Sequence, residues 1–204
     1  MNLGILGSTT LAYTLGSKYI ATGIEVSIGV RNGFEPKDIR WKILNMLSDK
    51  VFTYENTIAQ SEVILICCEN ENLKLVCEAL KNADLTDKIL IDCTNSSFNK
   101  VFKCNTTYIQ ECIGNKTIYK AFNNLGLDYP KSDPLGLIKE TYYCGESNVV
   151  KFRVKKLIEV VGFKAVDAGD LESAYLLEAF YHLRKEIAIN KRDQTDYHFK
   201  LISV

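Results

Sequence analysis

Residues 2–31 read NLGILGSTTLAYTLGSKYIATGIEVSIGVR, and this stretch decides the fold. Its first apolar run predicts a β-strand over 2–6, directly before Gly7. Apolar side chains at helical spacing then predict a helix over 9–22, which a glycine closes. A second apolar strand follows over 25–29. The chain therefore begins with a strand, a glycine turn, a helix and a second strand.

The same alternation of short apolar runs and longer helical patterns continues along the chain. Further strands are expected over 50–53, 62–67, 88–92, 117–121, 140–144 and 164–167, and further helices over 37–47, 72–81, 100–112, 149–161 and 171–190. This alternation predicts an α/β fold with a Rossmann-type, doubly wound, mainly parallel sheet. With no repeat or long linker, residues 1–204 are expected to form a single dinucleotide-binding domain. Residues 140–204 would be its small C-terminal helical and α/β portion, on the substrate side.

The overall composition narrows the class of partner. Lysine plus arginine and aspartate plus glutamate both number 25, so the formal net charge is zero. This balance gives no support to a nucleic-acid partner or to an anionic membrane surface. The sequence has no apolar run long enough to span a membrane, and the polar stretch 7–10 interrupts the apolar start. A soluble, cytoplasmic protein is therefore expected.

The cysteines indicate neither a metal site nor a disulfide framework. Their number is odd, none are spaced C-x-x-C, and only two histidines are present. Several cysteines lie inside apolar runs, as expected of reduced thiols that pack as small hydrophobic groups. The seven are Cys67, Cys68, Cys77, Cys93, Cys104, Cys112 and Cys144.

The turn after the first strand resembles the G-x-G-x-x-G/A pattern that places a pyrophosphate on a helix N-terminus. Gly7 supplies the first glycine and Ala12 the small third residue, but Thr9 stands where the middle glycine is usual. A β-branched residue there should crowd the phosphates, whereas the hydroxyls of Ser8, Thr9 and Thr10 could bond them. The pattern alone also fits a helix N-cap that binds no ligand.

The end of the second strand bears on which dinucleotide is bound. NAD sites place an acidic residue there to bond the ribose 2′-hydroxyl. Here the strand runs into Val30, Arg31 and Asn32, with no acid. A guanidinium suits a 2′-phosphate, so the site is expected to take NADP(H) rather than NAD(H).

Several segments together resemble the small NADP-dependent, coenzyme F-420 type reductases and the related N-terminal reductase domains of STEAP metalloreductases. The resemblance runs in order along nearly the whole chain. The segments are Gly4-Ile5-Leu6-Gly7-Ser8, Ile28-Gly29-Val30-Arg31-Asn32, Ile91-Asp92-Cys93-Thr94-Asn95, Lys120-Ala121-Phe122-Asn123-Asn124-Leu125-Gly126 and Gly162-Phe163-Lys164-Ala165-Val166-Asp167-Ala168-Gly169.

This resemblance implies positions for the cofactor-binding residues, all at strand ends on one side of the sheet. The pyrophosphate would lie on the turn, the 2′-phosphate at the end of the second strand and the ribose along a central strand. The nicotinamide and the second substrate would lie at the ends of two further strands. The residues implied are, in the same order, Gly7, Ser8, Thr9, Thr10 and Leu11; Arg31 and Asn32; Cys67 and Cys68; Asn95, Ala121 and Asn123. Thr9 and Val30 depart from the family pattern, and both changes predict weaker or altered cofactor binding.

The expected function is therefore hydride transfer between NADP(H) and a deazaflavin (F-420) or flavin acceptor. Such transfer needs no general acid or base, and no acid–base pair is evident in the sequence. A non-catalytic NADP(H)-binding or redox-sensor protein of the same fold is the alternative from another class. A β-hydroxyacid or imino-acid dehydrogenase is a rival enzyme, but such enzymes add a long helical domain, and about one helix follows Gly169 here.

The last expected helix also predicts how chains associate. Leu176, Leu177, Phe180, Tyr181 and Leu183 form an apolar stripe on it. The stripe could pack on the protein's own core or on a second copy, and a homodimer is expected.

Overall fold

The computed structural model describes residues 1–34, 49–97, 104–114, 116–191 and 197–202. Its centre is an eight-stranded sheet with the order β3-β2-β1-β4-β5-β6-β7-β8. Neighbouring strands are parallel except β6 and β7, which are antiparallel. The predicted doubly wound, mainly parallel α/β sheet is confirmed. The strands are β1 (Asn2–Leu6), β2 (Glu25–Val30), β3 (Val51–Thr53), β4 (Val63–Ile66), β5 (Ile89–Asp92), β6 (Ile118–Ala121), β7 (Glu140–Cys144) and β8 (Lys164–Asp167).

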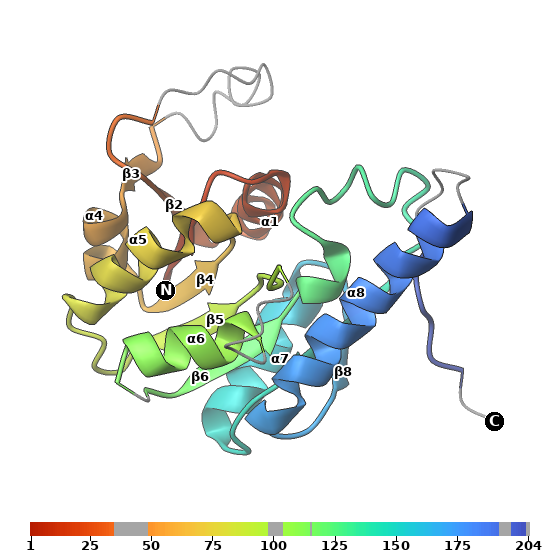
Figure 1. Cartoon of the computed structure of the whole chain (residues 1–204). Helices are drawn as coiled ribbons and strands as arrows, with labels where there is room; N and C mark the ends of the chain where they lie inside the picture. The colour runs from red at the N-terminus through yellow and green to blue at the C-terminus, as the bar shows by residue number, and fades with distance from the viewer. Residues whose placement is uncertain (35–48, 98–103, 115, 192–196, 203–204) are drawn as a thin grey trace.

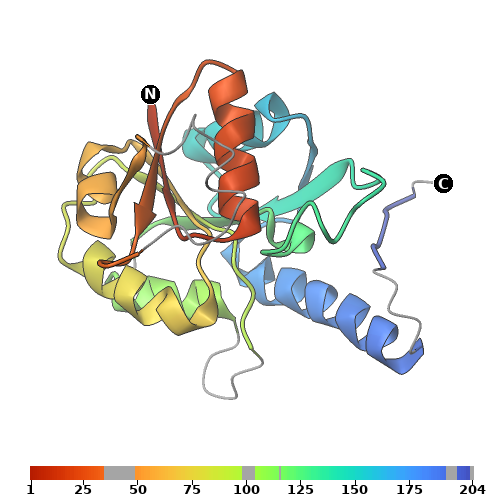
Figure 2. The same cartoon turned by 90° about the horizontal axis from the view of Figure 1, so that it is seen from above.

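Helices cover both faces of the sheet, as Figure 2 shows from above. On one face α1 (Thr10–Ala21) and α7 (Val149–Val160) pack on a core that includes Leu15, Tyr19 and Ile158. On the other face lie α4 (Tyr54–Gln60), α5 (Asn70–Lys81) and α6 (Asn105–Cys112), with their own buried cluster. Because the central strands bury side chains on both faces, they read as continuous apolar runs in the sequence.

The C-terminal part of the chain packs against the β6–β8 end of the sheet. A 3-10 turn, η2 (Leu171–Ser173), leads into the long helix α8 (Ala174–Lys191), which crosses this end in Figure 1. Leu177 of α8 shares a small buried cluster with Tyr142 and Cys144 of β7. Within the part of the chain that the structure describes, no helix is long and apolar enough to cross a membrane.

Most of the expected elements are present within a residue or two of their predicted bounds. Helix α1 ends where predicted, because Gly23 has a φ of 82°, which favours glycine. The helix expected over 37–47 lies outside the described residues, and so does the beginning of the one expected over 100–112. Helix α4 was not predicted. Its two turns are too short to show a period, although Thr53 caps it by accepting a bond from the Asn56 N–H at 3.3 Å.

Candidate functional site: a dinucleotide cradle at the switch point of the sheet

Strand β1 lies between β2 and β4, so the chain winds outward from it in both directions. In open α/β sheets a ligand binds in the crevice at this switch point, beyond the carboxyl ends of the strands. The glycine turn after β1 and Cys67 after β4 meet there, since the Cys67 N–H donates to the Leu6 carbonyl at 2.8 Å. The topology therefore brings together residues that are 60 positions apart in sequence.

Gly7 is required at this turn for two reasons. Its φ is 136°, a conformation that side chains with a Cβ rarely adopt. A Cβ there would also lie 2.3 Å from the Cys67 carbonyl oxygen. The backbone of the turn thus passes directly over the end of β4, which only glycine permits.

Thr9 has a structural task in this turn. It is the N-cap of α1, and its Oγ1 accepts a bond from the Ala12 N–H at 3.1 Å. The same hydroxyl donates to the Cys67 carbonyl at 2.8 Å, and the residue is only 5% exposed. The Thr9 side chain is therefore directed into the protein, and its hydroxyl has both a donor and an acceptor partner there.

The neighbours of Thr9 divide into two kinds. Leu11 is fully buried, and its N–H donates to the Leu127 carbonyl at 2.9 Å, so the Leu11 N–H already has a protein partner. Ser8 and Thr10 are half-buried and keep some contact with solvent. Of the three hydroxyls expected to face a phosphate, those of Ser8 and Thr10 suit that role better than that of Thr9.

At the end of β2, Arg31 and Asn32 are exposed, and Val30 is buried. Burial raises the pKa of the Tyr54 hydroxyl, as do Cys68 and Glu69, whereas the charge of Arg31 acts to lower it. Arg31 thus lies close enough to Tyr54, the first residue of α4, to act on it electrostatically. Tyr54 was not among the expected site residues, because the helix it begins was not predicted.

Cys67 and Cys68 lie at the end of β4, as expected, but their side chains belong to the core. Cys67 is 0% exposed and Cys68 1%, and they point into the clusters on opposite faces of the sheet. Burial raises the pKa of both thiols, and the neighbouring Cys93 thiol raises that of Cys67 further. Only the backbone of these residues can border a ligand in the crevice.

Asn95 and Asn123, from the ends of β5 and β6, are brought together. The Asn95 Nδ2 donates to the Asn123 carbonyl at 2.9 Å, and the Asn123 Nδ2 donates to the Asn95 Oδ1 at 3.0 Å. Asn123 is fully buried, and its Oδ1 has no hydrogen-bond partner among the described residues. Phe122, between Ala121 and Asn123, has a φ of 63°, a left-handed conformation that costs a non-glycine residue about 1–2 kcal/mol. Strain of this kind concentrates at functional sites.

A buried cluster of charges supports the two asparagines from below. The Nζ of Lys120 lies 2.7 Å from Asp92 Oδ2 and 2.7 Å from Glu178 Oε1, and all three side chains are at most 2% exposed. Burial opposes the charge on Lys120 most strongly, but the two carboxylates outweigh it and raise the Lys120 pKa. Glu178 also accepts a bond from the Ser96 N–H at 2.7 Å, which links α8 to the loop that carries Asn95.

This cluster was not predicted from the sequence, where no acid–base pair is evident. One signal was present, because Asp92 and Lys120 are charged residues in otherwise apolar strands. They face each other in the register of β5 and β6. Glu178, in contrast, comes from a helix distant in sequence, and only the fold brings it to the pair. The carboxylates and the ammonium group satisfy one another inside the core, so the cluster positions other residues rather than reacting itself.

The strand order and the glycine turn at its switch point define a protein with a Rossmann-type fold. Within this class, the profile of the family described as "NADP oxidoreductase coenzyme F420-dependent" matches residues 2–96. The resemblance predicted from the sequence segments is thereby confirmed over this part of the chain.

Individual relatives agree with the family match. The rat protein named Metalloreductase STEAP3 is 27% identical over 87% of this chain, and the human protein named Metalloreductase STEAP2 is 25% identical over the same share. The aligned region covers 36% and 35% of these relatives, so the chain spans about a third of their length.

Solved structures confirm the fold over the full length of the chain. A protein of Arthrobacter sp. FB24, provisionally assigned as an F420-dependent NADP reductase, superposes with a TM-score of 0.81. It is 21% identical, and the match covers 100% of both chains. A reductive aminase from Aspergillus terreus, in complex with NADPH and ethyl-5-oxohexanoate, has a TM-score of 0.62 and 14% identity. That match covers 94% of this chain and 62% of the aminase.

Proposed function

We propose that this protein is an oxidoreductase that uses NADP(H) and passes a hydride between the nicotinamide and a deazaflavin or flavin acceptor. The observation that carries the proposal is the exposed Arg31 at the acid-free end of β2, beside the Gly7 turn at the switch point. A guanidinium there matches a 2′-phosphate, whereas an acidic residue would match the free hydroxyl of NAD. The relatives whose names describe reductases support the same assignment.

The residues at the turn and at the end of β2 suit the phosphates of such a cofactor. The turn approaches β4 closely because of Gly7, and Ser8 and Thr10 remain half-buried rather than packed in the core. Thr9 keeps the turn in place through its bonds to Ala12 and Cys67. In this assignment Ser8, Thr10 and the first turn of α1 face the pyrophosphate, and Arg31 with Asn32 faces the 2′-phosphate.

The ends of β5 and β6 suit the nicotinamide side. The buried Oδ1 of Asn123, without a partner among the described residues, could accept a bond from the carboxamide of the nicotinamide. Asn95 and the charged cluster beneath it hold Asn123 in place, and Ala121 is the small residue at the end of β6. NADPH supplies a hydride when bound, and the chain's part is to orient the rings and exclude water. Residues 140–204 contribute β7 and α8 to this side, which supports their assignment as the substrate-side portion.

The two alternative functions, a sensor and a dehydrogenase, have less support from the structure. The sensor interpretation rested on Thr9 and Val30, but the Thr9 side chain is directed into the protein and Val30 is buried, so neither crowds the phosphates. The dehydrogenase interpretation requires a further helical domain, and the match to the reductive aminase leaves more than a third of that enzyme without a counterpart here.

Turnover assays separate these functions. Purified protein is mixed with NADPH and either FMN or coenzyme F-420, and nicotinamide oxidation is followed by absorbance. The proposal expects NADPH consumption with at least one acceptor and much slower consumption of NADH. Binding of NADPH without its consumption would establish the sensor function instead. An imine as the only acceptor would support the dehydrogenase interpretation.

We also propose that the protein forms a homodimer through α8. The apolar stripe of this helix divides in the structure, since Leu177 is buried while Leu176 and Leu183 are 52% and 53% exposed. Tyr175 and Ile189 of the same helix are exposed as well. Light scattering should give twice the 23.1 kDa mass of one chain. The mass of a single chain would contradict the proposal, and Leu176→Glu with Leu183→Glu should dissociate the dimer.

A further inference from the structure

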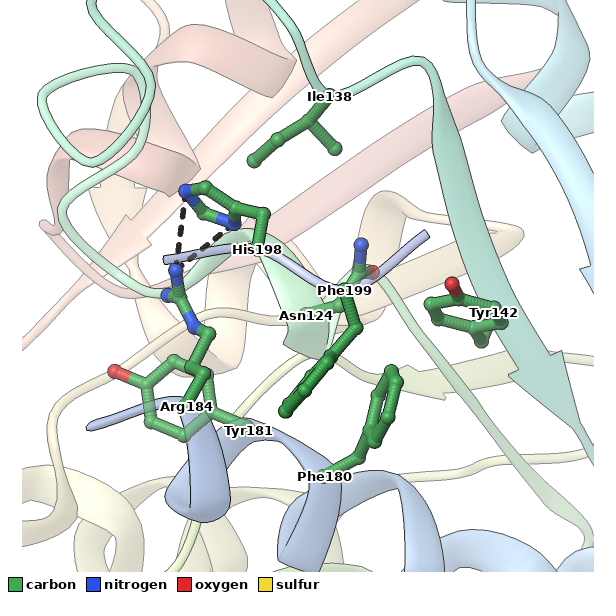
Figure 3. A pocket seen from close by; sticks show the side chains of 8 residues that line it. All are labelled: Asn124, Ile138, Tyr142, Phe180, Tyr181, Arg184, His198 and Phe199. Atoms are coloured by element: carbon green, nitrogen blue, oxygen red, sulfur yellow. Dashed lines mark hydrogen bonds between the residues drawn. The ribbon is translucent and has the colours of Figure 1, made fainter. Parts of the chain in front are cut away.

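Beyond the nicotinamide side lies a pocket that the cofactor does not account for. It is a small pocket of about 20 Å³ that opens to solvent. Its walls come from α8, from β7 with the segment before it, from the 3-10 turn η1 (Asn123–Leu125) and from residues 198–199 (Figure 3). The lining residues are Asn124, Ile138, Tyr142, Phe180, Tyr181, Arg184, His198 and Phe199.

Arg184 is the unusual residue in this pocket, because its guanidinium is buried but only partly paired. The residue is 3% exposed. Its Nη1 donates to the Tyr197 carbonyl at 3.2 Å and to His198 Nδ1 at 2.9 Å, as the dashed lines to His198 in Figure 3 show. Nε and Nη2 have no hydrogen-bond partner among the described residues. A buried guanidinium normally pairs with a carboxylate or phosphate, so these nitrogens indicate a missing anion.

Gly126 packs closely against this edge of the guanidinium. Gly126 has a φ of 81°, and a Cβ there would lie 3.2 Å from Nη2 of Arg184 and 2.9 Å from Asp128 Oδ1. Asp128 is thus near, yet among the described residues no carboxylate lies within the 4.0 Å of an ion pair with Arg184. Nε and Nη2 lie on the edge of a guanidinium that binds two oxygens of one anion side by side.

A second polar atom in the same pocket lacks a partner. Tyr142 is 6% exposed, and its hydroxyl has no hydrogen-bond partner among the described residues. Burial raises the pKa of this hydroxyl, so it remains protonated and able to donate. Most of the remaining lining is aromatic, with the Phe180 ring centroid 5.7 Å from that of Tyr142 and 4.2 Å from that of Phe199. A mainly apolar pocket with a few polar groups in its lining is the usual form of a ligand site.

We propose that Arg184 and Tyr142 bind an anionic group, a phosphate or a carboxylate, carried on the side chain of the hydride acceptor. This inference rests on the proposed function, which places the acceptor ring beside Asn123. Asn124, the next residue, lines the pocket, so the pocket lies one residue along the chain from the proposed place of that ring. Arg184 then acts as a specificity-determining residue that selects acceptors with an acidic tail.

FMN and riboflavin test the inference, because they share one ring system and differ by a phosphate. Quenching of flavin fluorescence measures their binding to the full chain, with and without NADP⁺. FMN should bind at least tenfold more tightly than riboflavin. A flavin with a carboxylate at the end of its N10 chain distinguishes the two anions, since tight binding of this compound alone would assign the site to carboxylates.

Variants test whether the preference for FMN over riboflavin depends on the residues of this pocket. Arg184→Met should abolish the preference for FMN, while Lys185→Met, at the adjacent residue on α8, should retain it. Tyr142→Phe removes one hydroxyl without altering the packing and should reduce the preference severalfold, which keeps the test decisive if Arg184→Met does not fold. Equal binding of FMN, riboflavin and the carboxylate flavin, or no binding at millimolar concentration, overturns the inference. If the unchanged protein shows the preference for FMN but does not bind NADPH, the proposed function is refuted instead.

Discussion

Replacing Lys120 with methionine should strongly destabilise the protein. Lys120 is fully buried, and its Nζ contacts Asp92 and Glu178, each at 2.7 Å. Methionine has a similar length but no charge, so the two carboxylates would be left buried without a cation. Breaking a buried ion pair by removing one partner costs roughly 3–5 kcal/mol. For a domain of this size, that corresponds to a fall of roughly 6–20 °C in Tm.

Urea denaturation followed by circular dichroism measures this effect. Lys156→Met is the matched control, because its 59% exposed side chain contacts Glu159 and the Phe152 ring at the surface, and it should lose less than about 1 kcal/mol. In the Lys120→Met variant, acidification should recover part of the lost stability, since protonation removes the repulsion between the two carboxylates. A loss below about 1 kcal/mol for Lys120→Met, equal to the control, would refute the view that this cluster holds the site together.

The pH dependence that Lys120 gives the unchanged protein lies in the alkaline range instead. The pKa of Lys120 in the folded state is raised above its unfolded value. Its contribution to stability is therefore fully present below the unfolded pKa of about 10.4 and is lost only as the pH rises through the higher folded value. Stability should thus decline in alkaline solution, and more steeply than for Lys120→Met, which has no ammonium group to titrate at this position.

Three further predictions concern the turn and the thiols. Gly7→Ala should destabilise the protein by roughly 3 kcal/mol or more in urea denaturation, since the alanine Cβ would meet the Cys67 carbonyl. Gly33 has a φ of 71° and open space around it, so Gly33→Ala should cost only about 1–2 kcal/mol by the same assay. Thr9→Val should lose about 1–2 kcal/mol by the same assay, because the helix cap and the bond to Cys67 both disappear, and an unchanged stability would contradict that role. Thiol labelling of the folded protein at neutral pH should begin at Cys112, the one cysteine that is not fully buried, and rapid labelling of Cys67 or Cys68 would contradict their place in the core.

The fold could be predicted from the sequence because its signals are local. The apolar runs of the central strands and the helix ended by Gly23 are visible within a few residues, and the strand order follows from the general rules of parallel sheets. Helix α4 was not predicted, because a helix of two turns is too short to show a helical spacing of apolar residues. The position of residues 197–202 was not predicted either, because nothing near them in sequence indicates the hydrogen bond between Arg184 and His198.

The site was predictable in position but less so in detail. Arg31 is predicted from its place at a strand end and Asn95 and Asn123 from the family resemblance, and the structure brings the two asparagines into contact. The role of Thr9 could not be predicted, because its hydroxyl partner is the Cys67 carbonyl, 58 residues away. The charged cluster and the Arg184 pocket depend in the same way on α8 packing against β6 and β7, a contact between distant parts of the sequence.

The central claim is that the switch-point site binds NADP(H) and that Arg31 recognises its 2′-phosphate. Titration of the protein with NADPH and with NADH, followed by nicotinamide fluorescence, tests it directly. NADPH should bind at least tenfold more tightly than NADH, because a charge-assisted hydrogen bond to phosphate contributes about 1.5–3 kcal/mol. Arg31→Gln should remove most of this difference. It should leave NADH binding unchanged, because Arg31 is exposed. The absence of any response at millimolar NADPH, or equal affinity for the two nucleotides, would contradict the account.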